Sequence, residues 1–233
     1  MNREINIVWI KRDLRLSDHA SFGEAEQSVL DYLPIYIFEP SFFEADDYSD
    51  RHGQFIFHSL KVMNESLSSV QREVICFCAP AETVFHYLSS EFLVNTVFSY
   101  QESGTRKTWG RDKAVAQLLN EKGIAWKQFQ RDGIIRGITN RKHWDQGWFQ
   151  VMEAPLINNN YSTGSLYLER NPFPLDEARM KVLEEYSEHF QIPGEIAAMK
   201  YLHSFCKERG KNYSRHISKP TESRLSCGRI SPY

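Results

Sequence analysis

This sequence predicts an α/β fold with a five-stranded parallel sheet flanked by helices, followed by a linker and the first helices of an α-helical domain. Short apolar runs alternate with segments of helical period over about the first 130 residues, which is typical of a βαβ series and a parallel sheet. From Asp176 onward only the helical period remains. The expected boundaries are residues 1–130 for the α/β domain, 131–175 for the linker and 176–233 for the incomplete helical domain.

Five apolar runs are expected to form the strands of the sheet. They are Ile5–Ile10, Leu33–Phe38, Val74–Phe77, Val94–Ser99 and Trp126–Phe129. The intervals between them are long enough for crossover helices, which parallel neighbours require. The sheet is therefore expected to be doubly wound and Rossmann-like.

The helices between the strands follow from apolar spacing and end signals. A long helix beginning near Ser49 or Asp50 is indicated by one stripe, Ile56, Leu60, Met63 and Leu67. Pro80 suits the first turn of the next helix. The helix before the fifth strand carries the stripe Val115, Leu118 and Leu119.

The segment after the sheet changes character. Residues 133–165 show no sustained period and include Asn158–Asn160, which favours a long interdomain connection. Trp144 and Trp148 stand four residues apart, so a short helix would place both indoles on one side as anchors for the linker. Two later stripes predict helices separated by Pro193–Gly194: Leu183, Tyr186 and Phe190, then Ala198, Tyr201, Leu202 and Phe205.

Composition excludes several classes of protein. With 41% hydrophobic and 25% charged residues, the 233-residue chain is an ordinary globular sequence able to bury a core. The net charge of -2 does not predict tight nucleic-acid binding, so any DNA contact needs a local patch. There is no signal-peptide pattern and no apolar run near the length of a membrane span. A cytoplasmic protein with no membrane contact is expected.

The cysteines and histidines do not predict a metal site. Cys76 and Cys78 are separated by one residue, too few for the usual pair of zinc ligands, and Cys206 and Cys227 have no partner at metal-ligand spacing. The eight histidines are scattered. Reduced, mostly buried thiols are expected.

The first predicted strand runs directly into a dense group of charges within residues 11–18. Lys11, Arg12, Asp13 and Arg15 follow the strand almost without interruption. Such charges are costly at a strand end unless they bind a ligand or pair with one another. One interpretation is a structural ion network that fixes the loop. The other is the lining of a ligand pocket, and both can hold together.

A second polar segment, residues 100–112, follows the fourth predicted strand. Glu102 stands just past the strand end, and Arg111–Asp112 is expected in the first turn of the next helix, where the aspartate suits the helix dipole. Ligands of open parallel sheets bind outside the carboxyl ends of the strands, where the strand order reverses. If strands one and four are neighbours, Lys11, Arg12 and Glu102 converge at that edge.

The third segment lies near the end of the chain. It consists of Asn-Tyr-Ser-Arg at residues 212–215 and Cys-Gly-Arg-Ile-Ser-Pro-Tyr at residues 227–233. Serine hydroxyls and backbone amides near a small residue donate well to phosphate oxygens, and an arginine supplies charge. This pattern favours a phosphate-binding segment.

In order along the chain, these three segments resemble motifs of the photolyase and cryptochrome family. Members of that family use light absorbed by a flavin to repair pyrimidine dimers in DNA, or to signal. The resemblance implies the strand order 3-2-1-4-5 and a first domain that can hold an antenna chromophore. It also implies that most of the helical flavin domain would follow this chain.

The resemblance assigns residues to two cofactor sites. Residues implied to contact flavin adenine dinucleotide (FAD) are Tyr213, Cys227, Gly228, Arg229, Ile230 and Ser231. Cys227 and Gly228 stand where the family often has hydroxyl side chains, so backbone donors would have to replace them. A competing register places residues 223–226 on the same signature. The later register is preferred because Ser231, Pro232 and Tyr233 continue the match.

Four residues are implied to border a possible antenna chromophore: Lys11, Arg12, Phe38 and Glu102. The alternative for Phe38 is packing in the core or in a lid. A folate, a deazaflavin, flavin mononucleotide or no chromophore at all remain open. Folate is disfavoured because Lys107 and Thr108 stand where the family's folate-binding side chains would be.

The function implied for the full-length parent is that of a deoxyribodipyrimidine photo-lyase acting on DNA that contains pyrimidine dimers. This chain would be mainly its antenna domain and would lack repair activity alone. One alternative is a cryptochrome-like blue-light sensor. The other is an unrelated nucleotide-binding α/β module, although no Gly-x-Gly-x-x-Gly turn follows the first strand. The basic residues near 136–143 are interpreted as a solvated loop rather than a DNA site.

Overall fold

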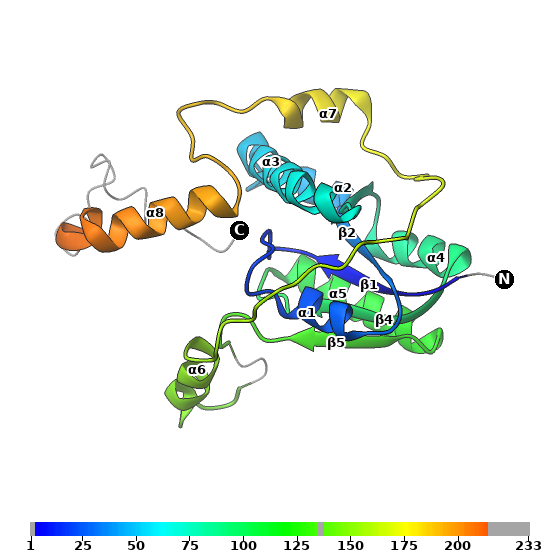
Figure 1. The fold of residues 1–233 in the computed structure, drawn as a ribbon, viewed down its shortest axis with the longest axis horizontal. Helices are drawn as coiled ribbons and strands as arrows, with labels where there is room; N and C mark the ends of the chain where they lie inside the picture. The colour runs from blue at the N-terminus through cyan, green and yellow to red at the C-terminus, as the bar shows by residue number, and fades with distance from the viewer. Residues whose placement is uncertain (1–2, 135–137, 214–233) are drawn as a thin grey trace.

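A computed structural model describes residues 3–134 and 138–213 (Figure 1). Its strands are β1 (Glu4–Ile10), β2 (Tyr32–Phe38), β3 (Ile75–Cys78), β4 (Leu93–Tyr100) and β5 (Ala125–Phe129). The helices of the first 130 residues are α1 (Ala20–Gln27), α2 (Pro40–Phe43), α3 (Asp50–Leu67), the 3-10 turn η1 (Ser68–Val70), α4 (Ala81–Glu91) and α5 (Arg106–Glu121). Later helices are α6 (Trp144–Met152), α7 (Glu177–Glu184), α8 (Glu195–Lys207) and the 3-10 turn η2 (Arg209–Asn212).

The five strands form one parallel sheet in the order β3-β2-β1-β4-β5, which confirms the predicted order. Each predicted strand is present, with its ends shifted by at most one residue. β1 is central and is hydrogen-bonded to β2 on one side and β4 on the other. The chain therefore builds the sheet outward from β1 in two directions, and the strand order reverses beside β1.

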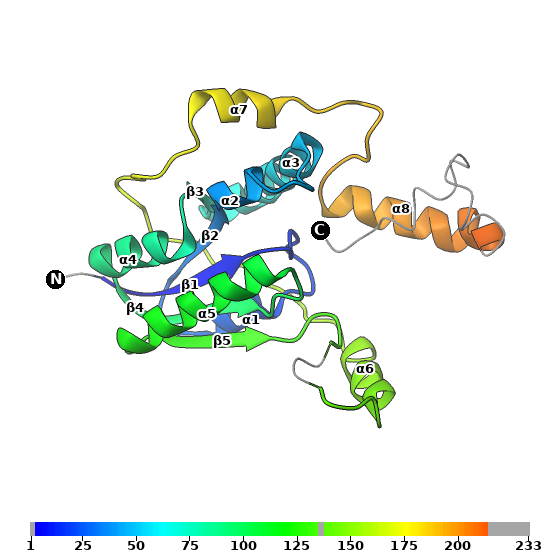
Figure 2. The ribbon, with the colours of Figure 1, turned by 180° about the vertical axis from the view of Figure 1, so that it is seen from behind.

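Two apolar clusters cover the two faces of the sheet. On one face Ile7 and Val97 pack with Phe85 of α4 and Val115 of α5. On the other face Val8 and Tyr36 pack with residues of α1 and α3. Because side chains alternate between faces along a strand, Ile7 and Val8 belong to different clusters. Figure 2 shows α4 and α5 in front of the sheet from behind the view of Figure 1.

The predicted apolar stripes lie where the helices pack. Ile56, Leu60, Met63 and Leu67 of α3 are all buried, and α3 begins after Ser49 as expected. Val115, Leu118 and Leu119 of α5 are buried as well. Pro80 is the residue just before α4 rather than its first helical residue.

The prediction of one helical stripe through Leu183, Tyr186 and Phe190 was wrong. Helix α7 ends at Glu184, and only Leu183 of the three lies on it. His58 of α3 donates through Nε2 to the Glu184 carbonyl oxygen at 3.0 Å, and the Tyr186 ring packs on the His58 ring at 5.2 Å. Contacts with α3 thus turn the chain at the end of α7, and they override the local period.

After α5 and β5, the predicted Trp144 and Trp148 pair is found on α6. The two indoles stack with their centroids 6.5 Å apart, which confirms that they share one side of the helix. Trp148 also lies against Gly133, where an added Cβ would come within 2.8 Å of the indole. Figure 1 shows α6 beyond the end of β5, away from the helices that cover the sheet.

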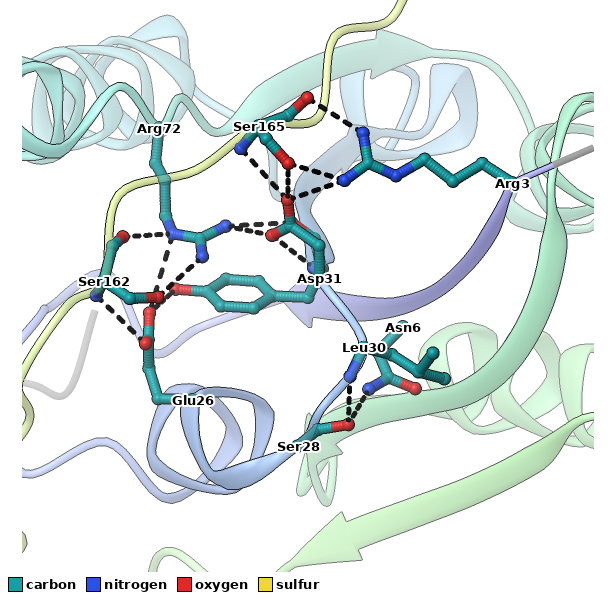
Figure 3. A network of polar contacts seen from close by, with 10 residues as sticks. Arg3, Asn6, Glu26, Ser28, Leu30, Asp31, Arg72, Ser162 and Ser165 are labelled. Carbon is teal, nitrogen blue, oxygen red and sulfur yellow. Dashed lines mark hydrogen bonds and ion pairs between the residues drawn. The ribbon is translucent and has the colours of Figure 1, made fainter.

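The extended segment after α6 runs along the α/β domain and is held by polar contacts (Figure 3). The centre of these contacts is Arg72, a buried residue between α3 and β3. Its guanidinium contacts Asp31 Oδ1 at 2.8 Å and Glu26 Oε1 at 3.5 Å, and it donates to the Ser162 carbonyl oxygen at 2.9 Å. Ser165 Oγ donates to Asp31 Oδ2 at 2.8 Å. Arg72 therefore joins α1, the start of β2 and the extended segment around Ser162.

Within residues 3–134 and 138–213, no helix combines the length and the hydropathy that crossing a membrane requires. The described helices are instead amphipathic or short, and the buried sides of α3, α4 and α5 face the sheet.

Candidate chromophore site

A cavity of about 560 Å³ opens beyond the carboxyl ends of β1, β2 and β4. Lys11 and Arg12 reach it from the end of β1, Phe38 from the end of β2, and Glu102 from the loop after β4. The four residues expected at an antenna site therefore line one cavity, beside the strand where the sheet order reverses. Parallel α/β sheets place their ligand sites at this position, and the volume lies within the ordinary range for small-molecule pockets.

The floor of the cavity is a network of ion pairs between β1, the β4–α5 loop and α5. Lys11 Nζ lies 3.2 Å from Asp112 Oδ2, and Arg12 Nε lies 2.7 Å from Glu102 Oε1. Arg111 contacts both carboxylates, at 2.8 Å to Asp112 Oδ1 and 3.6 Å to Glu102 Oε2. Arg12 keeps 35% of its side chain exposed, whereas Lys11 is 3% exposed. Arg12 is therefore the cation of the network most open to a ligand.

The position of Asp112 differs from the sequence prediction. Helix α5 begins at Arg106, so Arg111 and Asp112 lie in its second turn rather than its first. Asp112 is buried and pairs with Lys11. It therefore stabilises a buried lysine, and the prediction that it interacts with the helix dipole was wrong. The prediction from the local sequence put the start of the helix too late, because Arg106, Lys107 and Thr108 are already helical.

Burial shifts the pKa values of two groups that line the cavity. Burial lowers the pKa of Lys11 below its ordinary value of 10.5, and the nearby Asp112 carboxylate offsets this only in part. Burial raises the pKa of Glu39 above 4.5, although Arg111 and the amide of Ala81 act in the opposite direction. Glu39 accepts a hydrogen bond from that amide at 3.3 Å, at the start of α4.

An aromatic wall faces the charged floor. Phe38 and Phe43 stack with their ring centroids 6.0 Å apart, and Phe42 and Tyr48 form a T-shaped pair with their centroids 5.2 Å apart. Phe38, Phe42 and Tyr48 line the cavity, and Phe42 is 38% exposed. Phe38 is buried in the core and also lines the cavity, so both interpretations of this residue apply. An aromatic wall opposite fixed charges suits a planar conjugated molecule that carries polar groups.

The glycine of the β4–α5 loop keeps the loop close to this network. A Cβ at Gly104 would stand 2.6 Å from Glu102 Oε1 and 3.2 Å from Arg12 Nη2. A larger residue would therefore push on the Arg12 and Glu102 pair at the cavity. Glycine at this position leaves the Arg12 and Glu102 pair undisturbed.

The turn between β1 and α1 is fixed by a second, buried pair. Asp13 Oδ1 accepts a hydrogen bond from the Lys11 amide at 3.1 Å, and Asp13 Oδ2 lies 2.7 Å from His19 Nε2. The Phe22 amide donates to His19 Nδ1 at 3.3 Å, so the proton that binds Asp13 is on Nε2. Arg15 donates to the Asp18 carbonyl oxygen at 2.8 Å. Asp13 and Arg15 thus stabilise the turn, and Lys11 and Arg12 face the cavity.

The residues implied for the FAD site are only in part described. Tyr213 follows η2, is 38% exposed and contacts the edge of Phe205 at 5.7 Å. Cys227, Gly228, Arg229, Ile230 and Ser231 lie outside the described residues. The FAD assignment of these six residues stays a prediction.

Three contributors to the cavity were not found from the sequence. Arg111 and Asp112 were assigned to a helix start, and Trp9 was treated as part of the strand, yet Trp9 and Arg111 line the cavity and Asp112 holds Lys11. A signal for Asp112 was available in retrospect. An acidic residue on the apolar side of an amphipathic helix, three positions before Val115, needs a cation beneath it.

Comparison with known proteins identifies the family. The family model for DNA photolyase matches residues 6–146. The chain belongs to the DNA photolyase family. The match covers β2 to β5, all of β1 except its first two residues, and every residue that lines the cavity. It decides against an unrelated nucleotide-binding module. Members of this family generally bind FAD and an antenna chromophore.

Individual relatives agree with the family match. The deoxyribodipyrimidine photo-lyase of Vibrio cholerae is 22% identical over 98% of this chain and 52% of its own length. A blue-light photoreceptor of Arabidopsis thaliana is 23% identical over 66% of this chain and 34% of its own length. The chain thus spans about half the length of its relatives, or less.

Solved structures share the fold. A class III photolyase from Agrobacterium tumefaciens superposes with a TM-score of 0.71 at 21% identity, over 97% of this chain and 49% of that protein. An archaeal photolyase from Sulfolobus tokodaii, described with two FAD molecules and the implication of a novel light-harvesting cofactor, gives a TM-score of 0.64 at 18% identity, over 85% of this chain and 46% of that protein. At these identities the likeness establishes the fold alone.

Proposed function

We propose that this chain is the antenna half of a photolyase-related flavoprotein that repairs pyrimidine dimers in DNA under blue light. The observation that carries the proposal is the cavity beside β1, where Lys11, Arg12, Phe38 and Glu102 meet. The family match supports the flavoprotein assignment. The archaeal photolyase described with two FAD molecules and the implication of a novel light-harvesting cofactor supports a second, light-harvesting chromophore.

The residues of the cavity suit the binding of a planar chromophore. Phe42 and Tyr48 offer ring faces and edges to a conjugated system, and Arg12 offers a partly exposed cation to an anionic substituent. Because Arg12 is already held by Glu102, the guanidinium is positioned before a ligand arrives. The bound chromophore would supply light absorption, and the protein would hold it in place and exclude water from its ring.

The helical domain and the DNA contact belong to the proposal as well. Tyr213 and residues 227–231 would begin the FAD site, and the rest of that site would come from chain beyond residue 233. DNA with pyrimidine dimers would bind to the helical domain, and repair would need the dimer to leave the duplex stack. This chain alone is then expected to be inactive in repair.

A light sensor without repair activity is the second candidate. The Arabidopsis thaliana relative named as a blue-light photoreceptor favours it, since its match extends over 66% of this chain. The cavity serves both candidates equally, because light collection precedes repair and signalling alike. The two candidates differ only in what the excited flavin does.

The test is an absorption spectrum of the purified full-length protein, recorded beside that of this chain, with a repair assay on DNA containing pyrimidine dimers. The assay is run in blue light and in darkness. Bound flavin with light-dependent loss of dimers supports the photolyase. Flavin without repair supports the sensor, and a full-length protein without any flavin contradicts both.

A further inference from the structure

The Trp9 indole lines the cavity and lies within 5 Å of two cations. Lys11 Nζ is 4.7 Å from the centroid of the ring, and Arg111 Cζ is 4.9 Å from it. Trp9 is 1% exposed, and it is one of the residues that line the cavity. An indole that borders a ligand cavity therefore carries two cation–π contacts at once.

A second indole extends this arrangement toward the edge of the sheet. Trp126 of β5 lies with its ring centroid 5.7 Å from that of Trp9, and Lys11 Nζ is 5.5 Å from the Trp126 ring. Trp126 Nε1 donates to Ser99 Oγ at 3.0 Å, which fixes the orientation of the ring. One lysine thus contacts both members of an indole pair.

Indoles near an excited chromophore have a chemical consequence. Tryptophan is among the side chains that lose an electron most easily, and a photoexcited flavin-type ring is a strong one-electron oxidant. One electron leaves the indole for the excited ring and then returns, so nothing is consumed and the excitation is lost as heat. A site that passes excitation onward has to keep this exchange slow.

We propose that Lys11 and Arg111 are tuning residues that suppress electron loss from Trp9 to an excited chromophore in the cavity. The proposal rests on the proposed antenna function of that cavity. Electron loss would leave a positive charge on the indole, and two cations within 5 Å of the ring repel that charge in a site shielded from water. The carboxylates of Glu102 and Asp112 pair with these cations, but the groups that lie over the indole itself are the ammonium group of Lys11 and the guanidinium group of Arg111.

The position of Lys11 shows that the lysine does more than form an ion pair, because its ammonium group also contacts indole rings. An ion pair with Asp112 alone would require Lys11 Nζ near the carboxylate, with no need for an aromatic partner. Here the ammonium group also lies over Trp9 and close to Trp126. The contacts place the charge where it acts on the rings as well as on the carboxylate.

The test uses the 233-residue chain with riboflavin 5′-phosphate as the probe. Fluorescence anisotropy measures binding of the probe, and the fluorescence lifetime of the bound probe measures quenching. The variants are Lys11→Met, Lys11→Arg, Trp9→Phe and the double variant of Lys11→Met with Trp9→Phe. Circular dichroism confirms that each variant keeps the α/β fold.

In Lys11→Met, the lifetime of the bound probe is expected to shorten by about threefold or more, because one cation near the ring is lost. Lys11→Arg keeps the charge and should restore the wild-type lifetime. Trp9→Phe should lengthen the lifetime, and in the Trp9→Phe background Lys11→Met should change nothing. A purely structural role of Lys11 would not make its effect depend on the presence of Trp9.

The outcomes separate this inference from the function on which it rests. If the wild-type chain shows no saturable binding of the probe, the antenna function of the cavity fails and the inference fails with it. If the probe binds and the lifetime in Lys11→Met equals that of the wild type, the antenna function stands and the inference is wrong. A shortening that persists in the Trp9→Phe background also overturns it.

Discussion

Replacing Arg72 with methionine tests how the extended segment around Ser162 is held to α1 and β2. The guanidinium is buried over the Tyr32 ring at 3.9 Å, and it contacts carboxylates from two different segments and a linker carbonyl. Methionine fills much of the same space but can make none of these polar contacts. Two carboxylates, Glu26 and Asp31, would then remain mostly buried without their shared cation.

The expected loss of stability follows from that burial. Removing one partner of a buried ion pair usually costs about 3 to 5 kcal/mol. The side chain of Asp31 is 14% exposed and keeps contacts with Ser165 and Arg3, so the lower end, about 3 kcal/mol, is expected. For a chain of this size, that corresponds to a fall in the melting temperature of about 6 to 12 °C.

Urea denaturation and thermal denaturation followed by circular dichroism measure this loss. Arg3→Met is the matched control, because Arg3 contacts the same Asp31 at 3.4 Å with 48% of its side chain exposed. The control should cost less than about 1 kcal/mol. Adding Asp31→Asn to Arg72→Met should recover part of the loss, since it removes an unpaired charge. Equal costs for Arg72→Met and Arg3→Met would refute the reasoning.

Three further predictions follow from the same structure. Burial alone would raise the pKa values of Asp13 and Asp31, but several hydrogen bonds and nearby charges together lower both, led by His19 for Asp13 and Arg72 for Asp31. The unfolded chain therefore takes up their protons first as the pH falls, and the free energy of unfolding should hold steady above the ordinary value of 3.8 and decline below it. Urea midpoints at several pH values measure this decline, which should be shallower in Asp31→Asn. Leu183→Ala should lower the free energy of unfolding by about 2 to 5 kcal/mol or release α7 from α3, because the Leu183 side chain is buried where the two helices pack. Limited proteolysis would detect the release of α7 as new cleavage beyond residue 175. An unchanged digestion pattern together with an unchanged melting temperature would contradict the packing. Gly104→Val should weaken riboflavin 5′-phosphate binding by about tenfold or more through the Arg12 and Glu102 pair, whereas valine at the open Gly110 should leave binding unchanged in the same anisotropy titration.

The sheet and its ligand edge could be predicted because they depend on local patterns and one topological rule. Five apolar runs separated by helical segments define the parallel strands, and the carboxyl ends of neighbouring strands must meet. Lys11, Arg12 and Glu102 therefore converge as soon as β1 and β4 are adjacent. The strand order itself came from the family resemblance rather than from the pattern.

Other features depend on contacts between distant segments, which one sequence does not show. Arg72 belongs to no motif that the sequence shows, and the two carboxylates that it contacts, Asp31 and Glu26, lie 41 and 46 positions before it. Asp112 looks like a helix-start residue until β1 places Lys11 beneath it. The end of α7 is set by His58 on α3, so the apolar spacing beyond Glu184 gave the wrong structure.

The most direct test of the central claim is a crystal structure of the full-length protein purified in the dark with its own chromophores. The account predicts a planar chromophore in the cavity beside β1, bordered by Arg12 on one side and by Phe42 and Tyr48 on the other. It also predicts that the spectrum of the dissolved crystals shows this second chromophore in addition to flavin. A second chromophore bound elsewhere, or a cavity that holds only solvent, would contradict the account.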